Sequence, residues 1–93
     1  MKNYEALFIL KPDLEKEGVS ELYQKIANTV KKYNGGIQTQ EEWGKKTLAY
    51  KIKRFKEGTY YLLRFNIDPS QIVYLNGDFK VNEAIIRVLI TEV

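Results

Sequence analysis

The sequence contains no cysteine and no histidine. Without cysteine, neither a disulfide nor a thiolate metal site can form. Without histidine, the commonest general base, the commonest transition-metal ligand and the Ser–His and Cys–His nucleophile pairs are all missing. Carboxylates and lysines remain, so the composition leaves an enzyme few catalytic groups. We expect no metal site and no cofactor.

Long hydrophobic runs are also absent, so we expect no membrane-spanning segment, and no signal-peptide cleavage site follows 6-ALFIL-10. A hydrophobic fraction of 44% with clear periodicity predicts a folded chain. Ninety-three residues suffice for one two-layer core, so residues 1–93 are predicted to form a single domain. The formal net charge of +3 permits a polyanionic partner without requiring one.

Hydrophobic periodicity divides the chain into extended and helical segments. Residues 3–11, 37–54, 59–67 and 84–93 have the apolar, β-prone patterns of strands. Apolar residues three and four apart predict a helix that is capped by Asp13 and ends at 34-NGG-36. A second, short helix is predicted from 68-DPSQ-71, which offers an aspartate N-cap, a proline at the first helical position and a capping-box glutamine. A turn is predicted at 55-FKEG-58 and a bulge at Gly44.

The resulting order is β-α-β-β-α-β. Right-handed crossovers then place both helices on one face of a four-stranded antiparallel sheet, which is the ferredoxin-like α+β fold. The other face of the sheet stays open, and it should carry the two arginines at positions 64 and 87 because unpaired charges are rarely buried. By strand alternation this open face is predicted to comprise Glu5, Leu7, Ile9, Tyr60, Leu62, Arg64, Arg87 and Leu89.

Proteins of many functions share this fold, so a function has to be inferred from the sequence motifs. An RNA-recognition domain would stack bases on two exposed aromatics of the third strand, but 56-KEGTYYLLRF-65 offers only Tyr60, with Leu62 in the second place. An acylphosphatase-like enzyme would need a glycine-containing phosphate loop where the acidic 11-KPDLEKEG-18 stands. That enzyme is the weaker alternative, and a stand-alone ligand-binding regulatory module is the other.

The segment 41-EEWGKKTLAYKIKR-54 combines opposed charges with the only tryptophan. Adjacent strand residues point to opposite faces, so Glu41 and Glu42 do not form a catalytic pair. Alternating charges protect an edge strand from pairing with its own copies, and they also suit a charge-matched partner. Tryptophan is enriched among interface anchors, which favours a partner, but a tryptophan buried in a bulge is equally common.

Four segments together resemble one known family: 4-YE-5, 43-WGKKTLAYKI-52, 58-GTYYLLRF-65 and 82-NEAIIR-87. Over essentially its whole length the sequence is similar to bacterial small-subunit ribosomal protein six. It departs from the family in having lysine at position 51, where proline is common, and in ending at Val93 without the charged extension of some members.

The resemblance implies a non-enzymatic protein of the cytoplasmic ribosome, with no membrane and no small-molecule substrate. Such a protein binds the central domain of small-subunit ribosomal RNA together with small-subunit ribosomal protein eighteen. It further implies that the second strand is the edge that meets this protein partner, through Glu41, Glu42, Trp43, Lys45, Lys46 and Leu48.

For the RNA we predict a cluster on the neighbouring first and fourth strands. Lysine and arginine would contact phosphates, and asparagines would bond to phosphate or sugar. The predicted RNA-binding residues are Lys2, Asn3, Lys80, Asn82 and Arg87.

Overall fold

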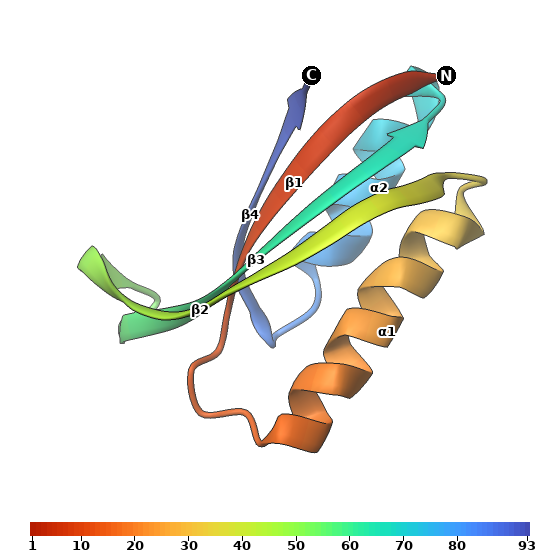
Figure 1. The fold of residues 1–93 in the computed structure, drawn as a ribbon. Coiled ribbons are helices and arrows are strands. Elements are labelled where there is room, and N and C mark those ends of the chain that lie inside the picture. Colours follow the sequence, from red (N-terminus) through yellow and green to blue (C-terminus); the bar gives the residue numbers. More distant parts are fainter.

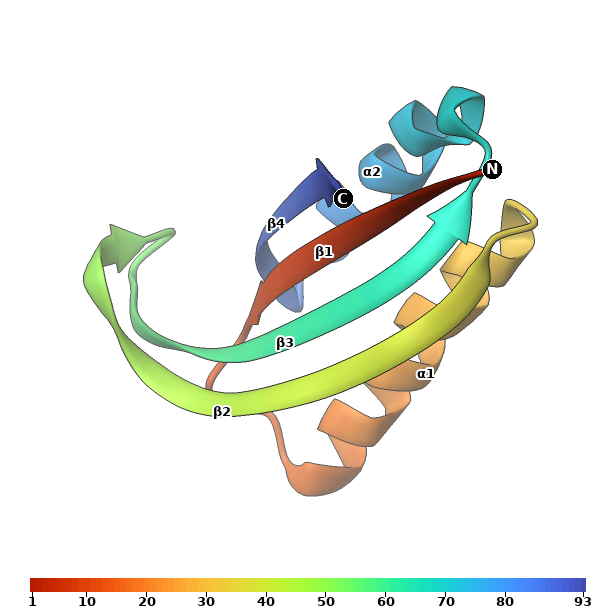
Figure 2. The ribbon, with the colours of Figure 1, turned by 45° about the horizontal axis from the view of Figure 1, so that its top comes forward.

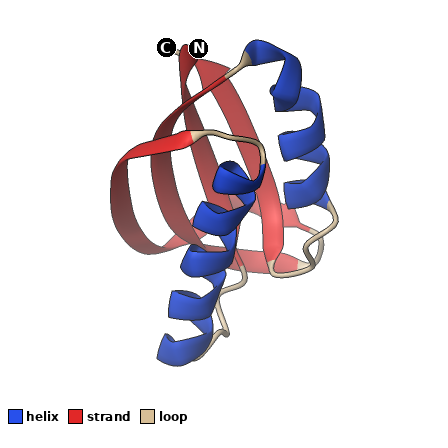
Figure 3. Cartoon of the chain, turned by 90° about the vertical axis from the view of Figure 1, so that its right-hand side faces the viewer, coloured by secondary structure: helices blue, strands red, loops and turns tan.

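A computed structural model describes all residues from 1 to 93. In chain order the elements are β1 (Lys2–Leu10), α1 (Lys16–Lys32), β2 (Gly36–Ile52), β3 (Phe55–Ile67), a 3-10 turn (Pro69–Gln71), α2 (Ile72–Lys80) and β4 (Ile85–Glu92). The strands form one antiparallel sheet in the order β2-β3-β1-β4, and both helices cover the same face (Figures 1 and 3). This confirms the predicted ferredoxin-like fold.

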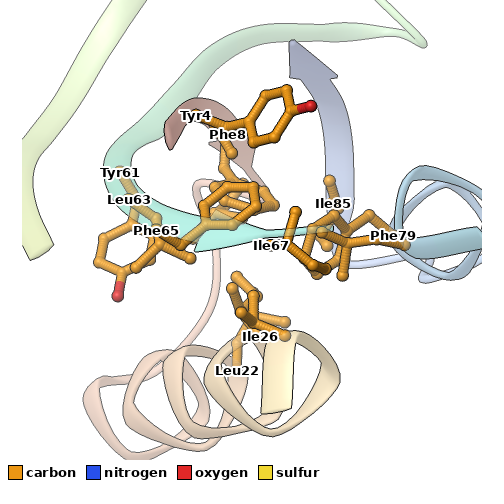
Figure 4. Close-up of a cluster of buried hydrophobic side chains, with 14 residues drawn as sticks. Tyr4, Phe8, Leu22, Ile26, Tyr61, Leu63, Phe65, Ile67, Phe79 and Ile85 are labelled. Carbon is orange, nitrogen blue, oxygen red and sulfur yellow. The ribbon is translucent and has the colours of Figure 1, made fainter. Parts of the chain in front are cut away.

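The core lies between the sheet and the two helices. Phe8, Leu63 and Phe65 point from the central strands toward Ile26 of α1 and Phe79 of α2, and all five are at most 2% exposed (Figure 4). The predicted strand alternation is confirmed, because Glu5 pairs with Arg64 and Leu7 with Leu62 on the opposite, open face. Burying aromatic and branched side chains on one face is the main force that joins the two layers.

The helix ends match the sequence pattern only in part. As predicted, the carboxylate of Asp68 accepts a hydrogen bond from the backbone N–H of Ser70 (3.0 Å), but Gln71 reaches only the Ser70 hydroxyl and completes no capping box. Asp13 does not cap α1, contrary to the prediction. The helix begins at Lys16, and its N-cap residue, Glu15, makes no side-chain hydrogen bond.

Neither helix is long and apolar enough to cross a membrane.

The β2–β3 turn lies earlier than predicted. Its two residues are Lys53 and Arg54, which both have positive φ (47° and 75°) and connect the paired residues Ile52 and Phe55. The predicted turn glycine, Gly58, lies inside β3 instead, opposite Lys46. A Cβ there would overlap Cγ2 of Ile9, so this glycine permits a close approach of the neighbouring strand and does not mark a turn.

The far half of the hairpin extends beyond the rest of the sheet. Strand β3 pairs with β1 only from Thr59 onward, so residues 45–58, which we call the hairpin arm, form a hairpin that extends past the end of β1 (Figure 2). Leu48 of the arm packs on Ile9 and Ile86 in a small second core, which also contacts Ile52, Phe55 and Tyr60. This apolar contact holds the arm over the end of the open face.

Candidate functional site

Strand β2 is an outer strand along its whole length, as predicted. It pairs only with β3, and its outward side has no neighbouring strand. Trp43 is the extra residue of a β-bulge, because Glu42 pairs with Tyr61 and Gly44 already with Tyr60. Gly44 has a φ of 82°, which an L side chain adopts only under strain, so the predicted bulge is confirmed at this glycine. The bulge leaves the tryptophan 43% exposed.

Glu41 lies on the open face, where it belongs to a charge network across three strands. Arg64 donates from Nε to Glu5 (2.8 Å) and from Nη1 to Glu41 (3.0 Å). The hydrogen bond to Glu5, followed by the nearby charges of both carboxylates, raises the pKa of Arg64. The network ties β2 to the centre of the sheet and neutralises one arginine.

Glu42 lies on the helix-covered face, beside the tyrosine pair that joins the two layers. The rings of Tyr23 and Tyr61 stack at 4.1 Å between centroids. Burial, and after it the charge of Glu42, raises the pKa of each tyrosine to about 12. The two adjacent glutamates thus face opposite sides, as strand geometry predicts, and offer no shared carboxylate site.

The remaining residues of the predicted partner edge differ in how they are used. The ammonium of Lys46 lies over the rings of Trp43 (5.5 Å) and Tyr60 (5.7 Å), a cation–π arrangement that positions the tryptophan. Lys45 is exposed on the edge. Leu48 is only 8% exposed, because its side chain packs into the second core and does not face a partner.

The five predicted RNA-binding residues do not lie in one cluster, so the predicted clustering on the first and fourth strands was wrong. Arg87 pairs opposite Ile9, whereas Lys2 begins β1, so they lie roughly 23 Å apart along the strand. Lys2 forms an ion pair with Glu92 (3.5 Å), and the Oδ1 of Asn3 accepts a hydrogen bond from Gln38. Neighbouring strands bring residues together only where their register matches, and the sequence does not reveal the register.

Lys80 and Arg87 lie at the other end of the sheet, beside a basic hollow. Lys80 and Arg87 line it together with Lys53, which the turn brings back toward β4, and its volume is about 350 Å³. None of these three side chains takes part in an ion pair. The Oδ1 of Asn82 is used locally, as the acceptor for the Ala84 backbone N–H (2.9 Å).

Sequence reasoning missed Lys53 as a member of this group. The adjoining hollow is lined by Lys11, Lys53, Arg54, Phe55 and Glu83, so the turn residues contribute two cations to this end of the sheet. The signal in the sequence was the pair Lys53-Arg54 itself, but it was assigned to a straight strand because glycine at position 58 indicated a later turn.

The middle of the open face offers little room for a small ligand. Its hollow, lined by Leu7, Ile9, Tyr60, Arg87 and Leu89, has a volume of about 180 Å³. Ligand pockets usually enclose roughly 300–1,000 Å³. Leu62 lies beside Tyr60 on β3 and is 6% exposed, so this strand offers no second aromatic ring for base stacking.

Comparison with known proteins agrees with this geometry. The family model "Ribosomal protein S6" matches residues 3–92. The small ribosomal subunit protein bS6 of Desulforamulus reducens is 37% identical over 90 residues, which cover 97% of this chain and 95% of that protein. The bS6 of Moorella thermoacetica is 34% identical over 91 residues, covering 98% and 93%. The crystal structure of 30S ribosomal protein S6 from Thermotoga maritima has a TM-score of 0.92 at 28% identity, covering 99% of this chain and 87% of that one. The chain therefore belongs to the ribosomal protein S6 family, whose members are structural proteins of the small ribosomal subunit and not enzymes.

Proposed function

We propose that this protein binds the central domain of small-subunit ribosomal RNA as a pair with small-subunit ribosomal protein eighteen. The observation that carries the proposal is the free β2 edge in a chain of the S6 family. Its outward backbone N–H and C=O groups have no partner strand, and such an edge is either protected or used for binding.

Three features support the β2 edge as the surface that meets the protein partner. Trp43 stands out from the bulge as a half-exposed anchor, held by Lys46. Glu42 and Lys45 present opposite charges close to it, which suits a partner of mixed charge. Glu41 and Leu48 act indirectly, since one is paired with Arg64 and the other anchors the hairpin arm.

The charge of the chain supports a shared RNA site. A net charge of +3 is too small for tight independent binding to a polyanion, so a basic partner would have to supply further phosphate contacts. Of the five candidates, Lys80 and Arg87 have unpaired charges and line one hollow. We propose backbone and shape recognition there, because β3 carries Leu62 where a second stacking aromatic would stand.

The first test is co-purification. The tagged protein, recovered from a bacterial lysate, should bring down small-subunit ribosomal RNA and a small basic protein identified by mass spectrometry as ribosomal protein eighteen. Recovery of a small metabolite without either macromolecule would support a regulatory module and contradict the proposal.

The second test removes the two unpaired charges. The variant Lys80→Gln/Arg87→Gln should still pair with ribosomal protein eighteen, but its heterodimer should bind a central-domain RNA fragment more weakly. The slope of log affinity against log salt should flatten by roughly 1.5, the value for two lost phosphate contacts. The control Lys16→Gln/Lys31→Gln removes the same charge from exposed positions on α1. An unchanged affinity and slope in the Lys80/Arg87 variant would place the RNA surface elsewhere.

A further inference from the structure

The positive charge of the molecule is concentrated in the hairpin arm. Residues 45–58 contain one acidic residue, Glu57, and six basic ones, so the arm has a net charge of +5. Since the whole chain has +3, everything outside the arm sums to −2. None of the six takes part in an ion pair, and all are exposed: Lys45, Lys46, Lys51, Lys53, Arg54 and Lys56.

The conformation of the arm's tip is unfavourable for the residues it contains. A two-residue hairpin turn with positive φ at both positions favours Asn-Gly, because left-handed backbone crowds an ordinary side chain. Here the two positions are Lys53 and Arg54. Two cations therefore occupy the tip at a cost in conformational energy, and strain of this kind is found where function requires a particular side chain.

An exposed aromatic ring lies among these cations. Tyr50 is 68% exposed, whereas Ile52 and Phe55 on either side of the tip pack against the second core. Tyr50 directly precedes Lys51. It lies in the part of β2 between Thr47 and Ile52, whose residues have no paired residue in β3. Cations interleaved with an exposed ring are typical of surfaces that bind single-stranded nucleic acid, where phosphates meet lysine and arginine and bases stack on the ring.

We propose that the hairpin arm is an RNA-binding element, in which Lys51, Lys53, Arg54 and Lys56 contact phosphates and Tyr50 stacks on an unpaired base. The proposal rests on the function proposed above and extends it from the sheet to the arm. The second core fixes the arm over the end of the sheet, so Lys53 lies beside Lys80 and Arg87 and the basic surface is continuous. An acidic protein segment would also be attracted by the charge, but it would not require an exposed ring for stacking.

The decisive variant changes the charge of the tip without disturbing the fold. Lys53→Asn/Arg54→Gly replaces the tip with the residues that its backbone favours, so the melting temperature should stay or rise. The heterodimer with ribosomal protein eighteen should bind the central-domain RNA fragment on the order of tenfold more weakly, with a salt slope flatter by roughly 1.5. The charge-matched control Lys16→Gln/Lys31→Gln should bind like the unchanged protein.

A second pair of variants separates stacking from charge. Tyr50→Ala should weaken RNA binding roughly fivefold or more, because stacking of a base on an aromatic ring is lost, while the salt slope stays the same. Tyr50→Phe keeps the ring and should bind normally. Equal binding by Tyr50→Ala and Tyr50→Phe would overturn the stacking role.

The outcomes distinguish this proposal from the function on which it rests. If the unchanged heterodimer binds the RNA and Lys53→Asn/Arg54→Gly binds equally with the same salt slope, the arm proposal fails while the proposed function stands. If the unchanged heterodimer does not bind the RNA, both fail. If the variant pairs more weakly with ribosomal protein eighteen, and the heterodimer formed at higher protein concentration keeps the normal RNA affinity, the arm contacts protein. The proposal is then overturned.

Discussion

Two glycines in this protein serve opposite purposes, and their surroundings show why. Gly58 is buried in β3, and Ile9 of the neighbouring strand fills the space that a side chain would need. Ile9 cannot easily move aside, because it is 8% exposed and packed between Leu48 and Ile86. Gly77 is exposed on α2, and a Cβ there would meet no atom within 4 Å. The first glycine is required by packing, whereas the second only weakens its helix.

This contrast gives a stability prediction. Gly58→Ala should lower the free energy of unfolding by about 1–3 kcal/mol, because the methyl group overpacks the contact with Ile9. Gly77→Ala should raise it by about 0.5–1 kcal/mol, since alanine is the better helix former and nothing obstructs it. Urea unfolding of the two variants checks both signs. Equal effects from the two substitutions would show that the Ile9 contact is not restrictive.

At the scale of the element, β2 combines the risks and the uses of an edge strand. A long exposed edge invites pairing with other chains, and charged residues together with the bulge at Trp43 counter this. Because the bulge shifts the register by one residue, Glu42 and Lys46 lie on opposite faces, one beside Tyr61 and the other over Tyr60. The edge thus has charge on both faces and remains open to a partner that matches it.

The edge can be tested in two directions. Glu42→Lys/Lys46→Glu keeps the net charge but reverses its pattern, so association with ribosomal protein eighteen should slow, on the order of tenfold at low salt, through lost steering. Glu42→Val/Lys46→Val should instead make the isolated protein self-associate, because an apolar edge is no longer protected.

Stopped-flow mixing measures the association rate, and analytical ultracentrifugation measures self-association. The matched control for the reversal is Glu21→Lys/Lys25→Glu, an exposed pair on α1. If both edge variants bound the partner at the normal rate and stayed monomeric, the assignment of β2 as the partner edge would be wrong.

At the scale of the whole molecule, polar groups at the margin of the core join the layers as well as apolar packing. Tyr23 of α1 stacks on Tyr61 of β3, and the Tyr61 hydroxyl donates to Gln40 of β2 (2.7 Å). Between the helices, Asp78 of α2 accepts hydrogen bonds from Tyr33 (2.7 Å) and from Lys32 at the end of α1 (3.0 Å). The protonation state of a tyrosine hydroxyl therefore affects the contacts that join these elements.

Stability should consequently fall at high pH. Burial raises the pKa of Tyr23 and Tyr61 to about 12, above the value near 10 of an unfolded tyrosine, so the folded chain holds more protons between these values. The free energy of unfolding is then undiminished below pH 10 and decreases as pH rises from about 10 to about 12.

Urea unfolding at a series of pH values measures this loss. Tyr23→Phe/Tyr61→Phe removes both titrating hydroxyls, so its stability should depend less steeply on pH over this range, although it loses the hydrogen bond to Gln40 at every pH. All other ionisable groups are the same in both proteins, so their contributions cancel in the comparison. Equal slopes for the variant and the unchanged protein would contradict the role of the two tyrosines.

Local sequence patterns were sufficient to predict the fold and the two faces of the sheet. Strand alternation in β1 and β3 and the helical spacing of Leu22 and Ile26 are local patterns, and burial of one face follows from them wherever the layers meet. The bulge at Gly44 and the cap at Asp68 were also predictable, because they depend on backbone preferences of single residues. The same holds for the opposed directions of Glu41 and Glu42.

Which charged side chains lie together depends on how the strands pair, and it became visible only in the folded chain. Lys2 and Arg87 are on neighbouring strands but at opposite ends, because register is a relation between distant segments and leaves no local pattern. The turn at Lys53-Arg54 was hidden for a related reason, since the glycine that suggested a later turn was required by Ile9, far away in sequence. By bending the arm back over β4, the fold brings Lys53 beside Lys80 and Arg87, a basic surface that depends on chain path and packing more than on composition.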